Sequence, residues 1–144
     1  MDIYLPDTGK SSHKVVVLIY GSAWFANNMK QNAFQVFGRS LLDKGFAVVS
    51  INHRSSRDAK FPAQINDVKA AIRFIRANAA KYKLDTSFIG ITGFSSGGHL
   101  ASLAGTTNGV KSYTIGDKTV DLEDRKSTRL NSSHRHTSRM PSSA

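Results

Sequence analysis

The sequence predicts an α/β fold in which a mostly parallel sheet is covered by helices on both faces. Strand-like and helix-like segments alternate along the chain, and the strand-like segments are continuous apolar runs such as residues 15–20. Continuous apolar strands are typical of parallel sheets buried on both faces, and alternation with short connections favours right-handed crossovers. With 144 residues, 40% of them hydrophobic, the chain can form one ordinary core.

Each element follows from its own local pattern. Strands are expected at residues 3–5, 15–20, 46–51 and 88–92, and helices at about 34–44, 62–79 and from 97 onward. Phe34, Phe37 and Leu41 recur at helical spacing before a stop at Gly45. The second helix places its aliphatic residues on one face, with Lys69 and Arg73 elsewhere around it. Residues 84–87 are expected to form a turn.

Composition excludes several classes of function. The chain has no cysteine, so a disulfide framework, a thiolate zinc site and a thiol nucleophile are excluded, and we expect no metal and no cofactor. No apolar run approaches the ~20 residues of a membrane span, so no membrane partner is expected. The net charge of +10 alone would favour nucleic acid, but +4 of it lies in residues 124–144. We therefore expect no nucleic-acid partner.

The N-terminus leaves the localisation open. It lacks the basic and apolar regions of a signal peptide, which predicts the cytoplasm if Met1 is the true start. If Met1 is internal and a signal lies upstream, the periplasm or secretion is predicted instead.

Residues 124–144 differ in composition from the rest of the chain. They are rich in Ser and Arg and have no apolar periodicity, which is typical of a disordered tail. Asp124 to His134 and Ser138 to Ala144 also resemble the translation of a common DNA sequencing adapter. We therefore predict a partial catalytic domain at 1–123, which continues in the natural protein, and a non-native disordered tail at 124–144.

A Gly-x-Ser-x-Gly pattern lies between the last predicted strand and the last predicted helix. Gly93, Ser95 and Gly97 form it, and Gly98 follows. A nucleophilic hydroxyl must project from a tight turn, and the glycines remove side chains that would collide there. The helix N-terminus favours a developing oxyanion. A chance match rarely has this context, so we predict that Ser95 is a catalytic nucleophile.

A second small-residue loop, Tyr20 to Trp24, follows the first strong strand. Small side chains allow backbone N–H groups to approach a bound carbonyl oxygen, so Ser22, Ala23 and Ser96 are the candidate oxyanion hole. An ordinary turn at a strand end explains the same residues equally well. Trp24 and Phe25 are candidates for lining a substrate pocket.

Together these segments resemble a known family. Residues 20–24 resemble the His-Gly-Gly-x-Trp motif of the acetyl, feruloyl and general carboxylesterase branch of the α/β-hydrolases, with Tyr20 in place of His and Ser22 in place of the second Gly. Residues 61–67 and 93–100 resemble its Phe-Pro-Ala and Gly-x-Ser-x-Gly-Gly-His-Leu segments. The resemblance implies a truncated α/β-hydrolase fold whose catalytic Asp and His follow strands that this sequence lacks.

We expect structural rather than catalytic roles for three histidines and for Asp67. We expect His99 to face into the fold, His53 to pack, and His13 to lie in a surface turn. Asp67, beside Lys69 and Arg73 on one helix, is expected to form a structural ion pair or cap.

The expected function is two-step acyl transfer on a small-molecule ester without a cofactor. The resemblance alone implies small acyl esters, including acetyl or feruloyl esters of plant polysaccharide. Two alternatives remain open: cleavage of an amide by a formamidase or peptidase relative, and a fragment without catalysis, since the triad Asp and His are missing.

Overall fold

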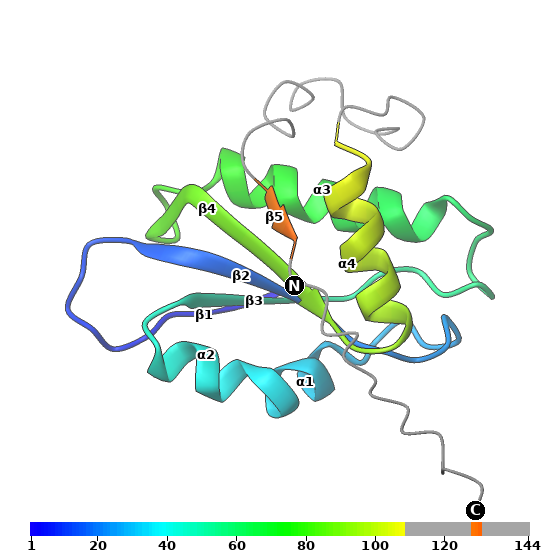
Figure 1. The fold of residues 1–144 in the computed structure, drawn as a ribbon, viewed down its shortest axis with the longest axis horizontal. Helices are drawn as coiled ribbons and strands as arrows, with labels where there is room; N and C mark the ends of the chain where they lie inside the picture. The colour runs from blue at the N-terminus through cyan, green and yellow to red at the C-terminus, as the bar shows by residue number, and fades with distance from the viewer. Residues whose placement is uncertain (109–127, 131–144) are drawn as a thin grey trace, which may run out of the picture.

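The structure, a computed structural model, describes residues 1–108 and 128–130. In this part of the chain a five-stranded sheet has the order β1-β3-β2-β4-β5 (Figure 1). β1 pairs antiparallel with β3, and all other pairs are parallel. The strands are β1 (Asp2–Tyr4), β2 (His13–Ile19), β3 (Ala47–Ile51), β4 (Leu84–Gly93) and β5 (Thr128–Leu130). The mostly parallel sheet that the sequence predicts is confirmed.

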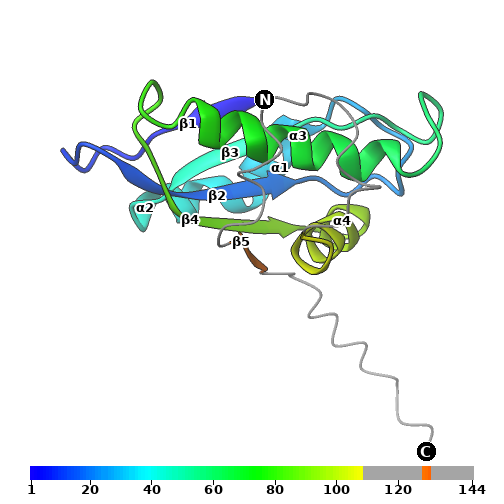
Figure 2. The same cartoon turned by 90° about the horizontal axis from the view of Figure 1, so that it is seen from above.

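Helices cover both faces of the sheet. α1 (Lys30–Ala33) and α2 (Arg39–Asp43) lie on one side, and α3 (Ala63–Ala77) and α4 (Ser96–Thr106) lie on the other (Figure 1). In Figure 2 α3 runs across the view and α4 is seen nearly end-on, so the two helices run in different directions over the sheet. A parallel sheet needs such cover on both faces, because its strands are apolar on both sides.

The two faces of β2 pack in two separate cores. Val15, Val17 and Ile19 are at most 1% exposed and face the core with α3 and α4. Val16 and Leu18 point the opposite way, toward the core under α1 and α2. Successive side chains of a strand alternate between faces, so one continuous apolar run supplies both cores.

The first crossover helix is not uniformly α-helical. A π-helical segment, Phe34–Gly38, joins α1 to α2. A Cβ at Gly38 would lie 2.2 Å from the Phe34 ring, so any larger residue there would require the Phe34 side chain to move. Helical spacing predicted the location of the helix, but not this widened turn, which lines a cavity beside the site.

The charged residues of α3 include two that are buried and one that forms an ion pair. Lys69 and Arg73 on α3 are buried, at 1% and 4% exposure, and Lys69 donates to the Thr107 carbonyl (2.6 Å). Asp67 does form an ion pair, but with Arg54, whose Nη2 lies 2.8 Å from Oδ1. This pair raises the pKa of the Arg54 guanidinium.

Two local expectations also change. Residues 84–87 belong to β4 rather than to a turn, and His13 opens β2 and is buried rather than lying in a surface turn.

The expected tail is only partly described. Thr128–Leu130 form β5, which pairs with Ile89–Ile91 of β4. These three residues therefore extend the sheet at β4, and the non-native disordered tail at 124–144 stays a prediction. The rest of that segment lies outside the described residues.

Candidate active site

The two candidate loops meet at the carboxyl ends of neighbouring strands. β2 and β4 pair in parallel with Ile19 opposite Gly93, so the chain leaves both strands at the same edge of the sheet. The loop after β2 begins at Tyr20, and the turn after β4 contains Phe94 and Ser95. In open α/β sheets this edge is where ligands bind.

Ser95 has a strained backbone. It lies at the N-cap of α4 with φ 53° and ψ −123°, a conformation that a residue with a Cβ rarely adopts. The side chain is exposed, at the positive end of the 11-residue helix α4. This turn therefore presents a hydroxyl outward, next to free helix N–H groups.

Close backbone packing around this turn leaves no room for a side chain at three glycines. A Cβ at Gly93 would lie 2.4 Å from the Gly97 carbonyl, and one at Gly97 would lie 2.2 Å from the Ile19 carbonyl oxygen. On the facing loop, a Cβ at Gly21 would lie 2.4 Å from the Phe94 carbonyl oxygen. Gly93, Gly97 and Gly98 lie where the sequence predicts the tight turn that carries Ser95, which we call the elbow. Gly21 packs against this elbow from the facing loop.

The loop after β2 contains a second strained turn. Ala23 and Trp24 have φ of 48° and 62°, and the Phe25 N–H donates to the Ser22 carbonyl (2.9 Å). Positive φ at both central residues defines a type I′ turn, which normally requires Gly or Asn. Among the described residues, none accepts a hydrogen bond from the Ala23 N–H. This donor is therefore free for a ligand.

Hydrogen bonds within the loop and to the segment after β3 hold this turn in place. The Tyr20 hydroxyl lies 3.1 Å from the Ala26 carbonyl oxygen and 3.2 Å from that of His53, and its ring stacks on His53 at 4.7 Å. Burial raises the pKa of the Tyr20 hydroxyl, which stays protonated. The Ser56 N–H also donates to the Trp24 carbonyl (2.8 Å).

The Ser22 N–H differs from the sequence expectation. It donates to Ser96 Oγ at 3.0 Å, so it is already satisfied within the protein and is not free for an oxyanion. Ser96 is buried, at 3% exposure, and this bond joins the elbow to the loop after β2. The remaining candidate donors are the N–H groups of Ala23 and Ser96.

Two apolar cavities flank the junction of the two loops. One of about 300 Å³ lies beside Gly21 and Phe94, under Met29, Val36 and Phe37. The other, of about 240 Å³, is lined by Ala23, Trp24, Ser56, Phe61, Gln64, His99 and Leu100. Volumes of this size fit small substrate groups.

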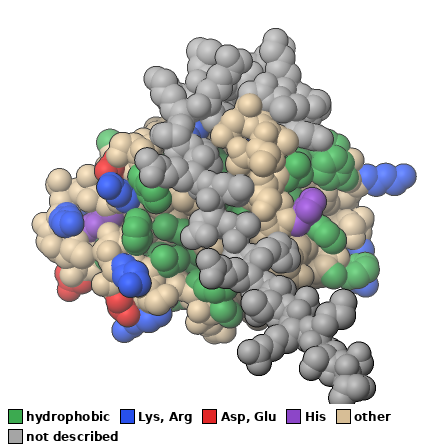
Figure 3. All heavy atoms as spheres, viewed as in Figure 1, with side chains coloured by type: hydrophobic (Ala, Val, Ile, Leu, Met, Phe, Trp, Pro, Cys, Tyr) green, Lys and Arg blue, Asp and Glu red, His purple; other side chains and the backbone are tan. Residues whose placement is uncertain are grey.

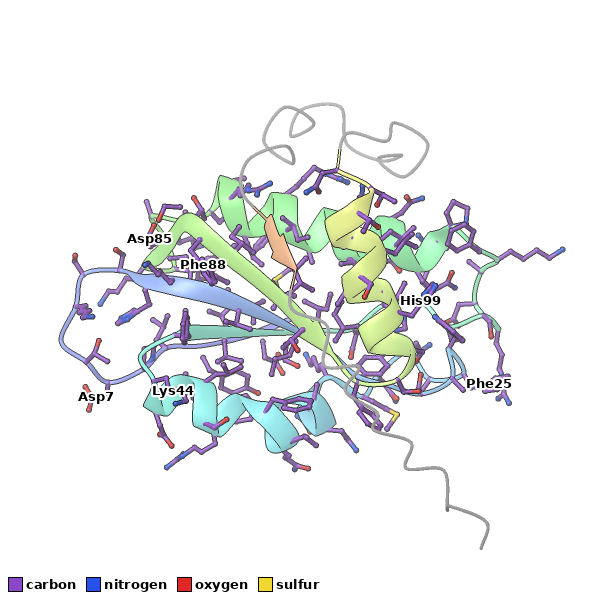
Figure 4. All side chains as sticks on the ribbon, in the orientation of Figure 1. Asp7, Phe25, Lys44, Asp85, Phe88 and His99 are labelled. Atoms are coloured by element: carbon purple, nitrogen blue, oxygen red, sulfur yellow. The ribbon has the colours of Figure 1, made fainter. Side chains whose placement is uncertain are left out.

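Of the two residues proposed to line a substrate pocket, Trp24 lines the second cavity and Phe25 lines neither. Phe25 is 60% exposed and lies over Arg57, whose guanidinium carbon is 5.4 Å from the ring centroid. Figure 4 shows Phe25 at the edge of the molecule, away from His99. On the face in Figure 3, hydrophobic side chains are exposed in the middle and on the right, with Lys and Arg mostly toward the periphery.

No described histidine is joined to the candidate nucleophile. His99 is exposed, contrary to the expectation, and its ring meets the edge of Trp24 at 5.5 Å. His53 is buried and packs on Tyr20, and within residues 1–108 no hydrogen bond links Ser95 Oγ to an imidazole.

The described residues also bear on metal sites and membrane spans. No three His, Cys, Asp or Glu side chains gather there as a metal would require. Within the same residues, no helix is long and apolar enough to cross a membrane.

Sequence reasoning missed two side chains at this site. Gln64 lines the second cavity from α3, and Ser96 contributes its hydroxyl as well as its N–H. In the sequence, only its position within the family-like Phe-Pro-Ala segment, residues 61–67, could have indicated a role for Gln64 at the site.

Known proteins with similar sequences are esterases. The chain is 42% identical over 90 residues to Esterase LipQ of Mycobacterium tuberculosis, covering 62% of this chain and 21% of the relative. It is 40% identical over 93 residues to the probable carboxylic ester hydrolase LipM of the same organism, covering 65% of this chain and 21% of the relative. The chain thus spans about a fifth of the length of these curated relatives.

Solved structures give the same result. A bifunctional GH43-CE protein of Bacteroides eggerthii is 92% identical with a TM-score of 0.76, over 84% of this chain and 16% of that one. A truncated carbohydrate esterase from gut microbiota is 65% identical with a TM-score of 0.75, over 84% and 42%. The BD-FAE family model matches residues 1–139. This chain therefore belongs to the BD-FAE family, a family of α/β-hydrolase esterases.

Proposed function

We propose that this chain carries the nucleophile of a serine carboxylester hydrolase, and that the nucleophile is Ser95. The observation that carries the proposal is its backbone at φ 53°, held by backbone contacts to Gly93, Gly97 and Gly21. Strain of this kind costs about 1–3 kcal/mol and persists where the surroundings enforce it. A strained, exposed serine at a helix N-terminus is suited to attack on an acyl carbon.

The oxyanion of the tetrahedral intermediate would be held by the N–H groups of Ala23 and Ser96. The first is unbound in the turn after β2, and the second belongs to the first turn of α4. Each such donor contributes on the order of 3 kcal/mol to the transition state. Ser22, expected as a third donor, would act by positioning, through its bond to Ser96 Oγ.

The chain alone is proposed to hydrolyse esters too slowly to measure. Its described residues provide no imidazole bonded to Ser95, and loss of a triad base costs orders of magnitude in rate. The base and acid are expected from further segments of the catalytic domain, because the chain spans only 42% of the truncated carbohydrate esterase.

The proposed substrates are small acyl esters, with acetyl or feruloyl esters of polysaccharide as the favoured class. The two cavities, of about 300 and 240 Å³, accommodate small groups on either side of the loop junction. The 65% identity to a carbohydrate esterase supports an ester of a carbohydrate.

A chimera tests the proposal. Residues 1–108 would replace the aligned segment of the truncated carbohydrate esterase, and hydrolysis of 4-nitrophenyl acetate would be measured. We expect activity in the chimera, a loss of about 10⁴-fold or more on Ser95→Ala, and none in the 144-residue chain alone. Retained activity in Ser95→Ala would remove Ser95 as the nucleophile.

The amide-cleaving alternative is tested with the same chimera. 4-Nitroacetanilide carries the same acetyl group as 4-nitrophenyl acetate but presents an amide. We expect kcat/KM to be far higher for the ester. Comparable values for the two substrates would favour an amidase instead.

A further inference from the structure

The lining of the second cavity includes one buried polar side chain, Gln64, beside the exposed side chains of Ser56 and His99. Trp24 and Phe61 contribute aromatic walls, and they are 36% and 58% exposed. Gln64, which reaches the cavity from the first turn of α3, is 4% exposed. A largely apolar cavity with one buried amide is typical of a site in which a polar group fixes the orientation of the ligand.

The hydrogen bonds of the Gln64 amide determine which atom is available. Its Nε2 donates to the carbonyl oxygens of Ser55 (3.1 Å) and Ala59 (2.8 Å). Both N–H bonds are thereby used, and because both partners are acceptors, the atom between them must be the nitrogen. The other amide atom is therefore the oxygen, which can only accept.

The Gln64 Oε1 atom is free and accessible. Among the described residues, none donates a hydrogen bond to it. It is also not one of the enclosed side-chain atoms without a partner, which in this part of the chain are His53 Nε2, Asn66 Oδ1 and Arg73 Nη1. A free acceptor on a buried side chain requires a donor from water or from a ligand.

We propose that the cavity between Trp24 and Phe61 binds a hydroxyl-bearing, saturated part of the ligand, as in a sugar, and that Gln64 Oε1 accepts a hydrogen bond from one hydroxyl. The aromatic side chains offer apolar area to the carbon skeleton, and the amide oxygen selects the donor. The assignment of this group to the substrate of Ser95 rests on the proposed esterase function. The binding itself does not.

The location of the cavity connects it to the chemistry. Ala23, which carries the proposed oxyanion donor, and His99, one turn after Ser95 on α4, both line it. A ligand held by Gln64 would therefore lie next to the reacting bond. Specificity for a hydroxyl follows, because a buried acceptor left unpaired penalises any ligand without the donor.

Binding can be measured on the 144-residue chain without turnover. Trp24 is the one tryptophan of the sequence, so its fluorescence reports on the cavity. The probe is methyl β-D-xylopyranoside, with its monodeoxy and monodeoxyfluoro analogues at each free hydroxyl. We expect saturable binding and, at one position, about tenfold weaker binding of both the deoxy and the fluoro analogue, because fluorine cannot donate.

Three variants sharpen the experiment. Gln64→Met is expected to abolish the discrimination at that position, whereas Gln35→Met, at an exposed glutamine of the π-helical segment, should retain it. Ser95→Ala should bind the probe like the wild type, because Ser95 does not line the cavity. Sugar binding can therefore be observed even if Ser95 proves not to be the nucleophile. No saturable signal, a fluoro analogue that binds as tightly as the parent, or unchanged discrimination in a folded Gln64→Met would each overturn it. If that variant does not fold, the analogue series on the wild type decides alone.

Discussion

The two loops of the site hold strained backbones in different ways. At the elbow, Ser95 is fixed by backbone packing: a Cβ at Gly93, Gly97 or Gly21 would come within 2.4 Å of a backbone atom. The turn at Ala23 and Trp24 is fixed by hydrogen bonds that Tyr20 and Ser56 donate and by one that Ser96 Oγ accepts from the Ser22 N–H. Backbone packing tolerates no added atom, whereas each hydrogen bond contributes only about 1 kcal/mol. Substitutions in the elbow should therefore cause large losses of stability, and substitutions in the second loop only small ones.

The largest effect is expected for Gly97→Ala. Its Cβ would lie 2.2 Å from the Ile19 carbonyl oxygen and 2.4 Å from that of Tyr20, and backbone atoms cannot move away by changing rotamer. We expect a loss of about 3 kcal/mol or more in the free energy of unfolding, measured by urea denaturation. Gly90→Ala is the control, because its Cβ would meet only side chains, at 3.3 Å or more. Equal tolerance of both variants would contradict the packing argument.

Relief of strain gives the next effect, with the opposite sign. Ser95→Gly can adopt φ 53° freely, whereas Ser95→Ala keeps the strain and removes the same hydroxyl. After the entropic cost of glycine, we expect the Gly variant to be more stable than the Ala variant by about 1 kcal/mol. Thermal unfolding of the two variants measures the difference. A less stable Gly variant would show that the elbow is not strained.

The elbow could be predicted from the sequence because its constraints are local. Gly93, Ser95 and Gly97 lie within five residues, and the turn itself requires those residue types. The strands were predicted for the same reason, since a buried strand must be apolar throughout. The free N–H of Ala23 was predicted as well, but only as one of three equivalent donors.

Other features depend on partners far along the chain. Ser96 Oγ binds the N–H of Ser22, 74 residues earlier, so no local pattern reveals that this donor is used. Lys69 looks like a solvated residue in the helical periodicity, yet it is buried where α3 contacts α4. The arginine that pairs with Asp67 lies in a loop 13 residues away and not on its own helix.

The bond between the two loops gives a smaller effect. Ser96→Ala removes the acceptor of the Ser22 N–H and should cost about 1 kcal/mol in the free energy of unfolding. It should also speed hydrogen exchange at the Ser22 amide, which a general loss of packing would not do selectively. Ser40→Ala, at an exposed serine on α2, is the matched control. Unchanged exchange at Ser22 would show that this bond does not hold the loop.

The smallest expected effect is a pH-dependent change in stability. It comes from Asp58, in the loop whose Ser56 N–H binds the Trp24 carbonyl. The Ser55 N–H, at 2.8 Å, lowers the pKa of the Asp58 carboxyl, with help from Asn27 and the Ser55 hydroxyl. A folded pKa below the unfolded value of 3.8 means that the contribution is complete well above pH 3.8 and is lost as the pH falls through the folded pKa.

Wild type and Asp58→Asn should therefore differ in stability at neutral pH and converge in acid. The comparison is best made by urea denaturation from about pH 6 down to about pH 3. Because Asp58 is exposed, the difference at neutral pH should be small, and smaller than that caused by Ser96→Ala. The Ser56 N–H, which binds the Trp24 carbonyl, belongs to the same loop, so the protection of its amide relative to intrinsic exchange at each pH should fall over the same pH range. A stability difference that grows in acid would reverse the sign and show that the carboxylate is not stabilised in the folded state.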